Sequence, residues 1–258
     1  MRILVTNDDG IQSEGIDVLV DALVSLGDVY AVAPEVEASA SGHALTLRRP
    51  LRIRKVSKQR YGVDGTPTDC VNVAVSQILK TVPDLVVSGI NKGWNLGDDV
   101  TYSGTVAGAL EGVLLGAPAL AVSQQRVRGA FDFKQAARIA KHLAGIVLQN
   151  GLPPRTFLNV NVPHQRARGV KVTSQAKRNH RTSVAEAFDP RRQAYYWIDE
   201  AKLEWEADGS SDYEMVRDGW ISITPLQSDW TAYGSIEEVK SLVGCVSPET
   251  TPSLIDDG

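Results

Sequence analysis

Short apolar runs alternate with segments of helical periodicity over the first 160 residues. Residues 3–5 are continuously apolar, which is typical of a buried strand. Apolar positions then recur every three or four residues over 16–24, which predicts one buried face of a helix that ends at Gly27. The same alternation predicts further strands at 29–33, 85–87, 119–122 and 157–160, and further helices over 71–79, 106–114 and 133–147.

Continuously apolar strands that alternate with helices indicate a parallel sheet covered on both faces. We therefore predict an α/β fold: a doubly wound, mostly parallel, Rossmann-like sheet in three layers. Residues 44–64 alternate between apolar and polar, which favours further β-structure, and Thr68 is the expected N-cap of the helix over 71–79. Ligands of such sheets bind beyond the carboxyl ends of the strands.

The alternation stops near residue 164. Residues 166–192 hold eight Lys and Arg against two acids, which fits either a solvated or subunit-facing arm or a nucleic-acid contact. Residues 177–206 read as a protruding hairpin arm with an aromatic face, covered either by the arm's own core or by a second subunit. We expect a homodimer or homotetramer. A strand at 220–223, a helix at 236–243 and a polar tail at 247–258 complete one domain spanning 1–258.

Composition narrows the class of protein. The chain has 258 residues, of which 43% are hydrophobic and 22% charged, as in ordinary globular proteins. A net charge of −4 argues against a general nucleic-acid binder. Cys70 and Cys245 are too few for a disulfide framework, so we expect buried thiols in a reducing compartment. The N-terminus does not resemble a signal peptide, and the most apolar stretch, 113–122, is too short to span a bilayer. We expect a cytoplasmic protein that binds no membrane.

Polar side chains gather where the predicted strands end. Asp8 and Asp9 follow the first strand, and adjacent carboxylates repel each other unless a cation lies between them. The alternative interpretation is that Asp8 and Asp9 bind no cation and serve only as a helix cap and a turn residue. The loop after the second strand carries Ser39 and Ser41, and the loop after the strand at 85–87 is rich in glycine and asparagine.

Hydroxyl, amide and carboxylate oxygens are ligands suited to Mg²⁺, Mn²⁺ or Ca²⁺. Ser103 to Thr105 precede a predicted helix, where backbone N–H groups form an anion site, unless these hydroxyls serve only as caps. A cation held by oxygens beside an anion site indicates phosphate ester chemistry. The chain has neither a dinucleotide-binding glycine fingerprint nor a Walker loop.

Several motifs, in order along residues 1–125, together resemble the stationary-phase survival protein SurE family. They are Val5-Thr6-Asn7-Asp8-Asp9-Gly10, Gly65-Thr66-Pro67-Thr68-Asp69-Cys70, Ser88-Gly89-Ile90-Asn91, Asn95-Leu96-Gly97 and Tyr102-Ser103-Gly104-Thr105. The resemblance implies a divalent-metal-dependent 5′-nucleotidase acting on nucleoside monophosphates, with 3′-nucleotides and short polyphosphate as further substrates in some members. It also implies dimers or tetramers.

The resemblance assigns roles to single residues. It implies one Mg²⁺ or Mn²⁺ per subunit (Ca²⁺ in some crystals), with Asp8 and Asp9 as metal ligands and catalytic groups. Ser39 and Asn91 complete the implied metal ligands, and the implied phosphate contacts are Asn95, Ser103, Gly104 and Thr105. Tyr233 stands where some members have a histidine.

Two other classes of function stay open from sequence. One is a metal-dependent nucleotide-binding regulator without turnover. The other is an unrelated α/β enzyme, such as a glycosyltransferase-like protein, whose Asp-Asp pair holds a metal and a sugar nucleotide.

Overall fold

The computed structural model describes residues 1–127, 131–179, 182–200, 204–205 and 209–244. These residues form two compact units, Met1–Ser228 and Asp229–Gly258. The first unit contains the central sheet and every residue expected at the metal and phosphate site, so it carries most of the structure that follows.

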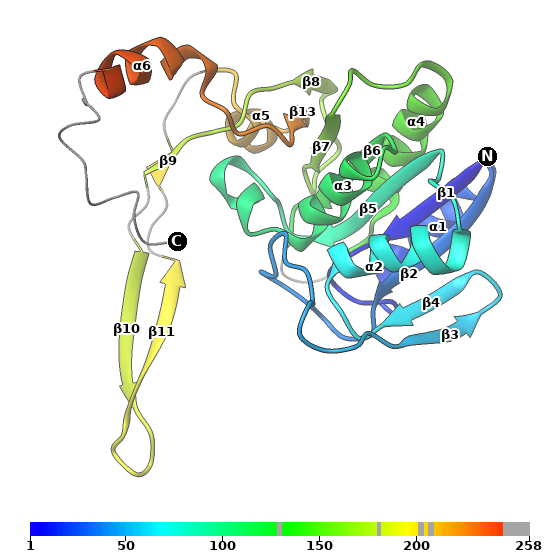
Figure 1. The fold of residues 1–258 in the computed structure, drawn as a ribbon, viewed down its shortest axis with the longest axis horizontal. Helices are drawn as coiled ribbons and strands as arrows, with labels where there is room; N and C mark the ends of the chain where they lie inside the picture. The colour runs from blue at the N-terminus through cyan, green and yellow to red at the C-terminus, as the bar shows by residue number, and fades with distance from the viewer. Residues whose placement is uncertain (128–130, 180–181, 201–203, 206–208, 245–258) are drawn as a thin grey trace. The chain divides into compact units, whose positions relative to one another are not determined.

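The centre of the first unit is a nine-stranded, mostly parallel sheet (Figure 1). In spatial order its strands are β3 (Ile53–Ser57), β4 (Arg60–Val63), β2 (Asp28–Pro34), β1 (Arg2–Thr6), β5 (Leu85–Lys92), β6 (Ala119–Gln124), β7 (Thr156–Val162), β13 (Ile221–Gln227) and β8 (Val170–Val172). The five strands from β2 to β7 run parallel, whereas β3 and β13 are antiparallel to their neighbours β4 and β7. Chain order reverses at β1, which pairs with both β2 and β5, and such a switch point is where ligands of open α/β sheets bind.

Helices cover both faces of the sheet and produce two separate cores. Helices α1 (Glu14–Leu23) and α4 (Lys134–Asn150) share one core with Ile3 and Val5 of β1. The residue between them, Leu4, belongs to the other core, beside α2 (Pro67–Val73) and α3 (Gly104–Leu114). Successive side chains of a strand point to opposite faces, so one short apolar run supplies both cores. The predicted three-layer α/β fold is confirmed.

Helix α3 lies unusually close to the sheet because glycines face the strands. A Cβ on Gly108 would stand 2.8 Å from side-chain atoms of Thr6 and Ser88. A Cβ on Gly112 would stand 2.8 Å from the side chain of Val86. Real Cβ atoms do not approach so closely, so only glycine permits this packing. The close packing brings the first turn of α3 to the carboxyl ends of β1 and β5.

The structure differs from the sequence predictions around α2. The N-cap is Thr66, not Thr68, because Pro67 takes the first helical position and Thr66 and Asp69 form a reciprocal capping box. The helix continues as a π-helical turn over Ala74–Leu79. Within residues 44–64, where alternation predicted β-structure, only β3 and β4 form strands and residues 44–52 do not. The short helix α5 (Asp212–Arg217) was not predicted.

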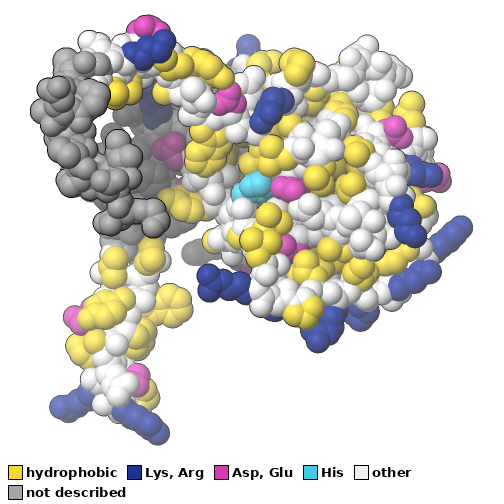
Figure 2. All heavy atoms as spheres, viewed as in Figure 1, with side chains coloured by type: hydrophobic (Ala, Val, Ile, Leu, Met, Phe, Trp, Pro, Cys, Tyr) yellow, Lys and Arg dark blue, Asp and Glu magenta, His cyan; other side chains and the backbone are white. Residues whose placement is uncertain are grey.

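The predicted arm contains a two-stranded antiparallel ribbon, β10 (Thr182–Phe188) with β11 (Ala194–Glu200), separate from the central sheet. The short strands β9 (Arg178–Asn179) and β12 (Glu204–Trp205) pair beside it. Figure 2 shows hydrophobic side chains along the ribbon, and Tyr196, Trp197 and Ile198 are 63%, 66% and 81% exposed. Successive residues of a strand point to opposite faces, so among the described residues nothing covers either face of the ribbon.

The described part of the second unit, residues 229–244, contains a 3₁₀ turn, Tyr233–Ser235, followed by α6 (Ile236–Gly244). Within it, the phenol of Tyr233 donates a hydrogen bond to the carboxylate of Asp229. The polar tail and Cys245 lie outside the described residues, whereas Cys70 is a buried free thiol as expected. Among the helices described, none combines the length and apolar character needed to cross a membrane.

Candidate metal and phosphate site

A tight turn at the end of β1 presents the two adjacent carboxylates. The side-chain amide of Asn7 closes this turn by donating to the Gly10 carbonyl at 3.2 Å and to the Ser13 hydroxyl at 2.7 Å. The Gly10 N–H in turn donates to the Asn7 amide oxygen at 3.2 Å. Asn7 is fully buried, and its hydrogen bonds hold the turn between β1 and α1 that carries Asp8 and Asp9.

Asp8 is the more buried of the two carboxylates, with 6% of its surface exposed. The hydroxyl of Thr105, in the first turn of α3, donates to Asp8 Oδ1. Burial raises the pKa of Asp8 above its usual value, and the hydrogen bond from Thr105 opposes that shift only in part.

Asp9 is partly exposed and lies close to the end of β5, where the N–H of Lys92 is 3.4 Å from its Oδ2. Its pKa is raised to about 6, first by burial and next by repulsion from Asp8. Glu37 adds repulsion at both carboxylates. Two acids whose charged forms are disfavoured side by side are arranged for a cation.

The described residues contain no group of three or more His, Cys, Asp or Glu side chains that would hold a metal ion. A cation at Asp8 and Asp9 therefore requires neutral oxygen ligands as well. Asn91 is suited to this because its amide nitrogen donates to the Gly93 carbonyl at 3.0 Å, which leaves its amide oxygen for a cation. Asn91 lies in β5, the strand next to β1.

Ser39 lies in the loop after β2. A backbone hydrogen bond joins this loop to Asp8. The N–H of Ala38 donates to the Asp8 carbonyl at 2.8 Å, so the loop passes beside the Asp8–Asp9 turn. The hydroxyl of Ser39 is exposed and donates to Glu37 Oε1 at 2.6 Å. Glu37, which the sequence analysis did not select, thus contacts Ser39 and acts on the charge of both aspartates.

The start of α3 faces Asp8 directly. Ser103 is the N-cap, and its hydroxyl oxygen accepts the N–H of Val106 at 3.1 Å. At the next position, a Cβ on Gly104 would stand 2.8 Å from Asp8 Cβ and 3.0 Å from Asp8 Oδ2. Only glycine therefore lets the first turn of α3 approach Asp8 this closely, which places the N–H groups of a helix N-terminus beside a carboxylate. A helix N-terminus attracts an oxyanion, and a carboxylate attracts a cation.

Asn95 is held by a separate buried network. Its side chain donates to Ser123 at 2.8 Å, and its N–H donates to Asn161 Oδ1 at 2.9 Å. The side-chain amides of Asn159 and Asn161 both donate to its carbonyl at 2.9 Å. The recorded bonds of Asn95 therefore run to β6 and β7, and they fix the backbone of the loop that follows β5.

The sequence analysis assigned no role to the supporting residues Asn159 and Asn161. A signal was present, because residues two apart in a strand share a face and two asparagines on one face of an otherwise apolar strand must find partners. Asp212 of α5 supports the same loop by accepting the N–H of Gly97 at 3.0 Å. The sequence analysis did not predict α5, although Ser211 and Glu214 have the S-x-x-E spacing of a capping box at the start of a helix.

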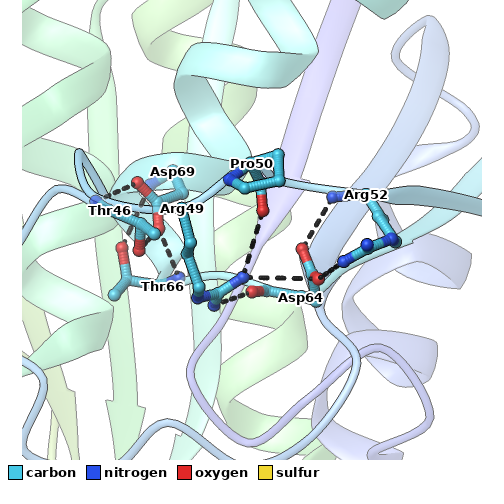
Figure 3. Close-up of polar contacts among 7 residues, drawn as sticks. All are labelled: Thr46, Arg49, Pro50, Arg52, Asp64, Thr66 and Asp69. Carbon is cyan, nitrogen blue, oxygen red and sulfur yellow. Dashed lines mark hydrogen bonds and ion pairs between the residues drawn. The ribbon is translucent and has the colours of Figure 1, made fainter.

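The loop from 38 to 47 is fixed at its far end by a second polar cluster. The N–H and hydroxyl of Thr46 donate to the carboxylate of Asp69 at 2.9 and 2.6 Å, and Asp69 also caps α2 with Thr66 (Figure 3). Beside it, Asp64 pairs with Arg49 at 3.3 Å and with Arg52 at 3.6 Å. The segment that precedes β3 is therefore joined to the start of α2 by hydrogen bonds in place of a strand ladder.

Comparison with known proteins agrees with this architecture. The family model described as Survival protein SurE matches residues 3–182. A protein of Geotalea daltonii named 5′-nucleotidase SurE is 48% identical over 243 residues, covering 93% of this chain and 98% of that protein. A protein of the same name from Syntrophotalea carbinolica is 49% identical over 238 residues, covering 92% and 95%.

A solved structure shows the same fold. The crystal structure of the SurE protein from Aquifex aeolicus superposes with a TM-score of 0.83 at 43% sequence identity, covering 94% of this chain and 99% of that one. The two proteins therefore share one fold over nearly the whole length of both chains. From the family model, the relatives and the shared fold, we conclude that this chain belongs to the SurE family.

Proposed function

We propose that this chain is a phosphatase that hydrolyses nucleoside 5′-monophosphates to nucleoside and phosphate and that it depends on a divalent metal. The observation that carries the proposal is the hydrogen bond from Thr105 to Asp8, which joins a carboxylate turn to a helix N-terminus at one point. A cation site and an anion site side by side suit a phosphate ester. The name 5′-nucleotidase SurE, borne by relatives about as long as this chain, supports the same reaction.

The residues present fit an oxygen-bound cation such as Mg²⁺ or Mn²⁺, and Ca²⁺ accepts the same kind of ligands. We assign its binding to Asp8, Asp9, Ser39 and Asn91, because the two aspartates are costly to ionise together without a cation. A bound divalent cation polarises a phosphoryl oxygen and lowers the pKa of a coordinated water.

The chain's own groups orient the ester. The N–H groups of Gly104 and Thr105 in the first turn of α3 are suited to hold phosphoryl oxygens, and the hydroxyl hydrogen of Ser103 remains available because its oxygen serves as the cap. Asn95 is a further substrate contact. Asp8 already accepts the Thr105 hydroxyl, so we assign the general-base role to Asp9, whose carboxylate is more accessible and takes a proton from the attacking water.

We also propose that the functional unit is a homodimer or homotetramer in the cytoplasm. The exposed aromatic side chains on both faces of the β10–β11 ribbon support this, because a two-stranded hairpin is marginally stable in water unless something covers it. A net charge of −4 does not favour nucleic acid as the covering partner.

The test is an assay of free phosphate. The purified protein is incubated with nucleoside 5′- and 3′-monophosphates and short polyphosphate, each with Mg²⁺, Mn²⁺, Ca²⁺ or a chelator. We expect phosphate release from 5′-monophosphates with Mg²⁺ or Mn²⁺ and none with the chelator; release from 3′-monophosphates or polyphosphate would extend the substrate range. Nucleotide binding without phosphate release under every condition would contradict the proposal and indicate a regulator without turnover.

A further inference from the structure

A buried carboxylate on α3 has no part in the site described so far. Glu111 is 6% exposed, and burying a carboxylate is costly unless its oxygens are hydrogen-bonded. Its Oε1 accepts the side-chain amide of Asn72 at 2.6 Å, and its Oε2 lies 2.7 Å from Nε2 of His43. A carboxylate only accepts, so Nε2 carries the hydrogen of the second contact. The two partners differ in place, because Asn72 lies on α2 whereas His43 lies on the loop that carries Ser39.

The part of this loop around Ser39 is attached to the fold on either side. Before it, the N–H of Ala38 donates to the Asp8 carbonyl at 2.8 Å, and after it the N–H of Gly42 donates to the Tyr102 carbonyl at 3.0 Å. Tyr102 lies just ahead of α3, and the contact of His43 with Glu111 follows about two turns further along that helix. The loop is therefore held to α3 at two separate points.

Between these attachments the loop has little that would keep its shape. Ala40 has a φ of +55°, a left-handed conformation that a residue with a Cβ adopts only at a cost in free energy. Among the described residues, the hydroxyl of Ser39 bonds only to Glu37, which is two positions away in the same loop and is also exposed. The place of Ser39 beside the Asp8–Asp9 turn therefore depends on the attachments at 38, 42 and 43.

We propose that His43 and Glu111 are positioning residues for the cation site, because their contact holds the loop against α3 and so keeps Ser39 within reach of the cation. The proposal rests on the metal-dependent function proposed above, in which Ser39 is a metal ligand. Neither His43 nor Glu111 touches the cation or the substrate in this assignment. Outer partners of this kind orient the groups that bind a metal, and their loss lowers metal affinity.

The first test measures the Mn²⁺ affinity of His43→Ala and of wild type by titration calorimetry, with Tm in chelator. The side chain of His43 is 33% exposed and lies on a loop, so its truncation leaves both cores intact. We expect Mn²⁺ to bind about 10-fold more weakly. His43→Gln should restore the affinity to within a few fold of the wild-type value, because the Gln side-chain amide can donate to Glu111 in place of Nε2.

Asn72→Ala is the matched control. It takes a donor from the same carboxylate but leaves the contact between His43 and Glu111, and it also removes the bond from Asn72 to the Thr68 carbonyl at 3.1 Å. We expect it to lower the Tm in chelator at least as much as His43→Ala does, with Mn²⁺ affinity within a few fold of the wild-type value. Loss of stability and loss of metal binding are thereby separated.

A double-mutant cycle tests whether His43 acts through Ser39. We expect Ser39→Ala to weaken Mn²⁺ binding at least as much as His43→Ala does. In the Ser39→Ala background, His43→Ala should then cause little further loss, because the group that it positions is already absent. Losses that simply add would show that His43 affects the cation by another route and would overturn the proposal.

Three further results would also overturn it: wild-type Mn²⁺ affinity in His43→Ala, equal losses of affinity in His43→Ala and Asn72→Ala, or no rescue by His43→Gln. Failure of the proposed function looks different. A wild-type protein that binds Mn²⁺ but releases no phosphate from nucleotides contradicts only that function, since the Mn²⁺ titrations do not depend on turnover. A wild-type protein that binds no Mn²⁺ contradicts both.

Discussion

The hydroxyl of Thr105 donates a hydrogen bond to the carboxylate of Asp8, although the two residues are 97 positions apart in the chain. Asp8 lies in the turn after β1 and Thr105 in the first turn of α3, so this contact exists only when the strand and the helix are both in place. It sets the distance between the proposed cation ligands and the proposed phosphate contacts. The predictions below test this arrangement and the surroundings that hold it.

Removing either carboxylate should abolish most of the turnover and spare the fold. We expect Asp8→Asn and Asp9→Asn to lower phosphate release by about 100-fold or more, as loss of a group that acts on the reacting atoms does. Their ligand-free Tm should be unchanged or higher, since two adjacent carboxylates repel each other without a cation. Asp21→Asn, an exposed carboxylate on α1, is the control. Wild-type turnover at saturating metal in either variant would refute that residue's role.

The stability of the metal-free protein should fall as the pH rises through the range in which Asp9 titrates. The pKa of Asp9 is about 6 in the folded protein against a usual value of 3.8. Between those values the folded state binds more protons than the unfolded state, so the free energy of unfolding decreases with rising pH. Asp8, whose pKa is also raised, acts in the same direction.

Tm measured in chelator across that pH range checks this prediction. Asp9→Asn should lose less stability than the wild type over the same interval, and added Mn²⁺ should stabilise the wild type more at pH values above the range than within it. An identical pH dependence in the wild type and Asp9→Asn would show that Asp9 does not titrate as described.

The two hydroxyls at the start of α3 should differ in their effects. Ser103→Ala removes the N-cap and should cost about 1 kcal/mol of stability. Thr105→Ala removes no cap but leaves the buried carboxylate of Asp8 without its donor, so we expect metal affinity to fall about 10- to 100-fold and stability to fall by roughly 1–3 kcal/mol. Ser103→Ala should leave metal affinity within a few fold. Denaturant unfolding and metal titration of both variants distinguish the roles; the reverse pattern would exchange them.

The asparagine network beneath Asn95 should matter for both stability and substrate binding. Asn161→Ala leaves the N–H of Asn95 without its acceptor in a buried place, which should cost roughly 1–3 kcal/mol. Because the loop that carries Asn95 then shifts, KM should rise more than kcat falls. Asn150→Ala, at the exposed end of α4, is the control. A stability loss with unchanged KM would limit Asn161 to a structural role.

The ribbon should be needed for assembly and dispensable for the metal site. Replacing residues 182–200 with a short glycine linker removes the exposed side chains of Tyr196, Trp197 and Ile198. We expect sedimentation to show a lower oligomeric state than that of the full chain, with Mn²⁺ affinity retained within a few fold. A full-length protein that sediments as a monomer at micromolar concentration would contradict the proposed assembly.

Local sequence determined much of this fold. Apolar runs such as 3–5 and 85–87 predicted the parallel strands, and helical periodicity predicted α1, α3 and α4, because burial on one or both faces imposes a pattern within a short window. Strand ends in an α/β sheet converge on one edge, so the positions of Asp8, Asn91 and Thr105 after strands or before a helix already indicated a common site. The mostly parallel sheet and the family were both confirmed.

Only the tertiary structure decided how these residues meet. The bond from Thr105 to Asp8, the contact of His43 with Glu111 and the support of Asn95 by Asn161 join residues more than 60 positions apart. The raised pKa of Asp9 depends first on its burial, which no local window of the sequence reveals. The physical reason is that periodicity reports which face of an element is buried, whereas hydrogen bonds and desolvation depend on which distant elements are packed against that face.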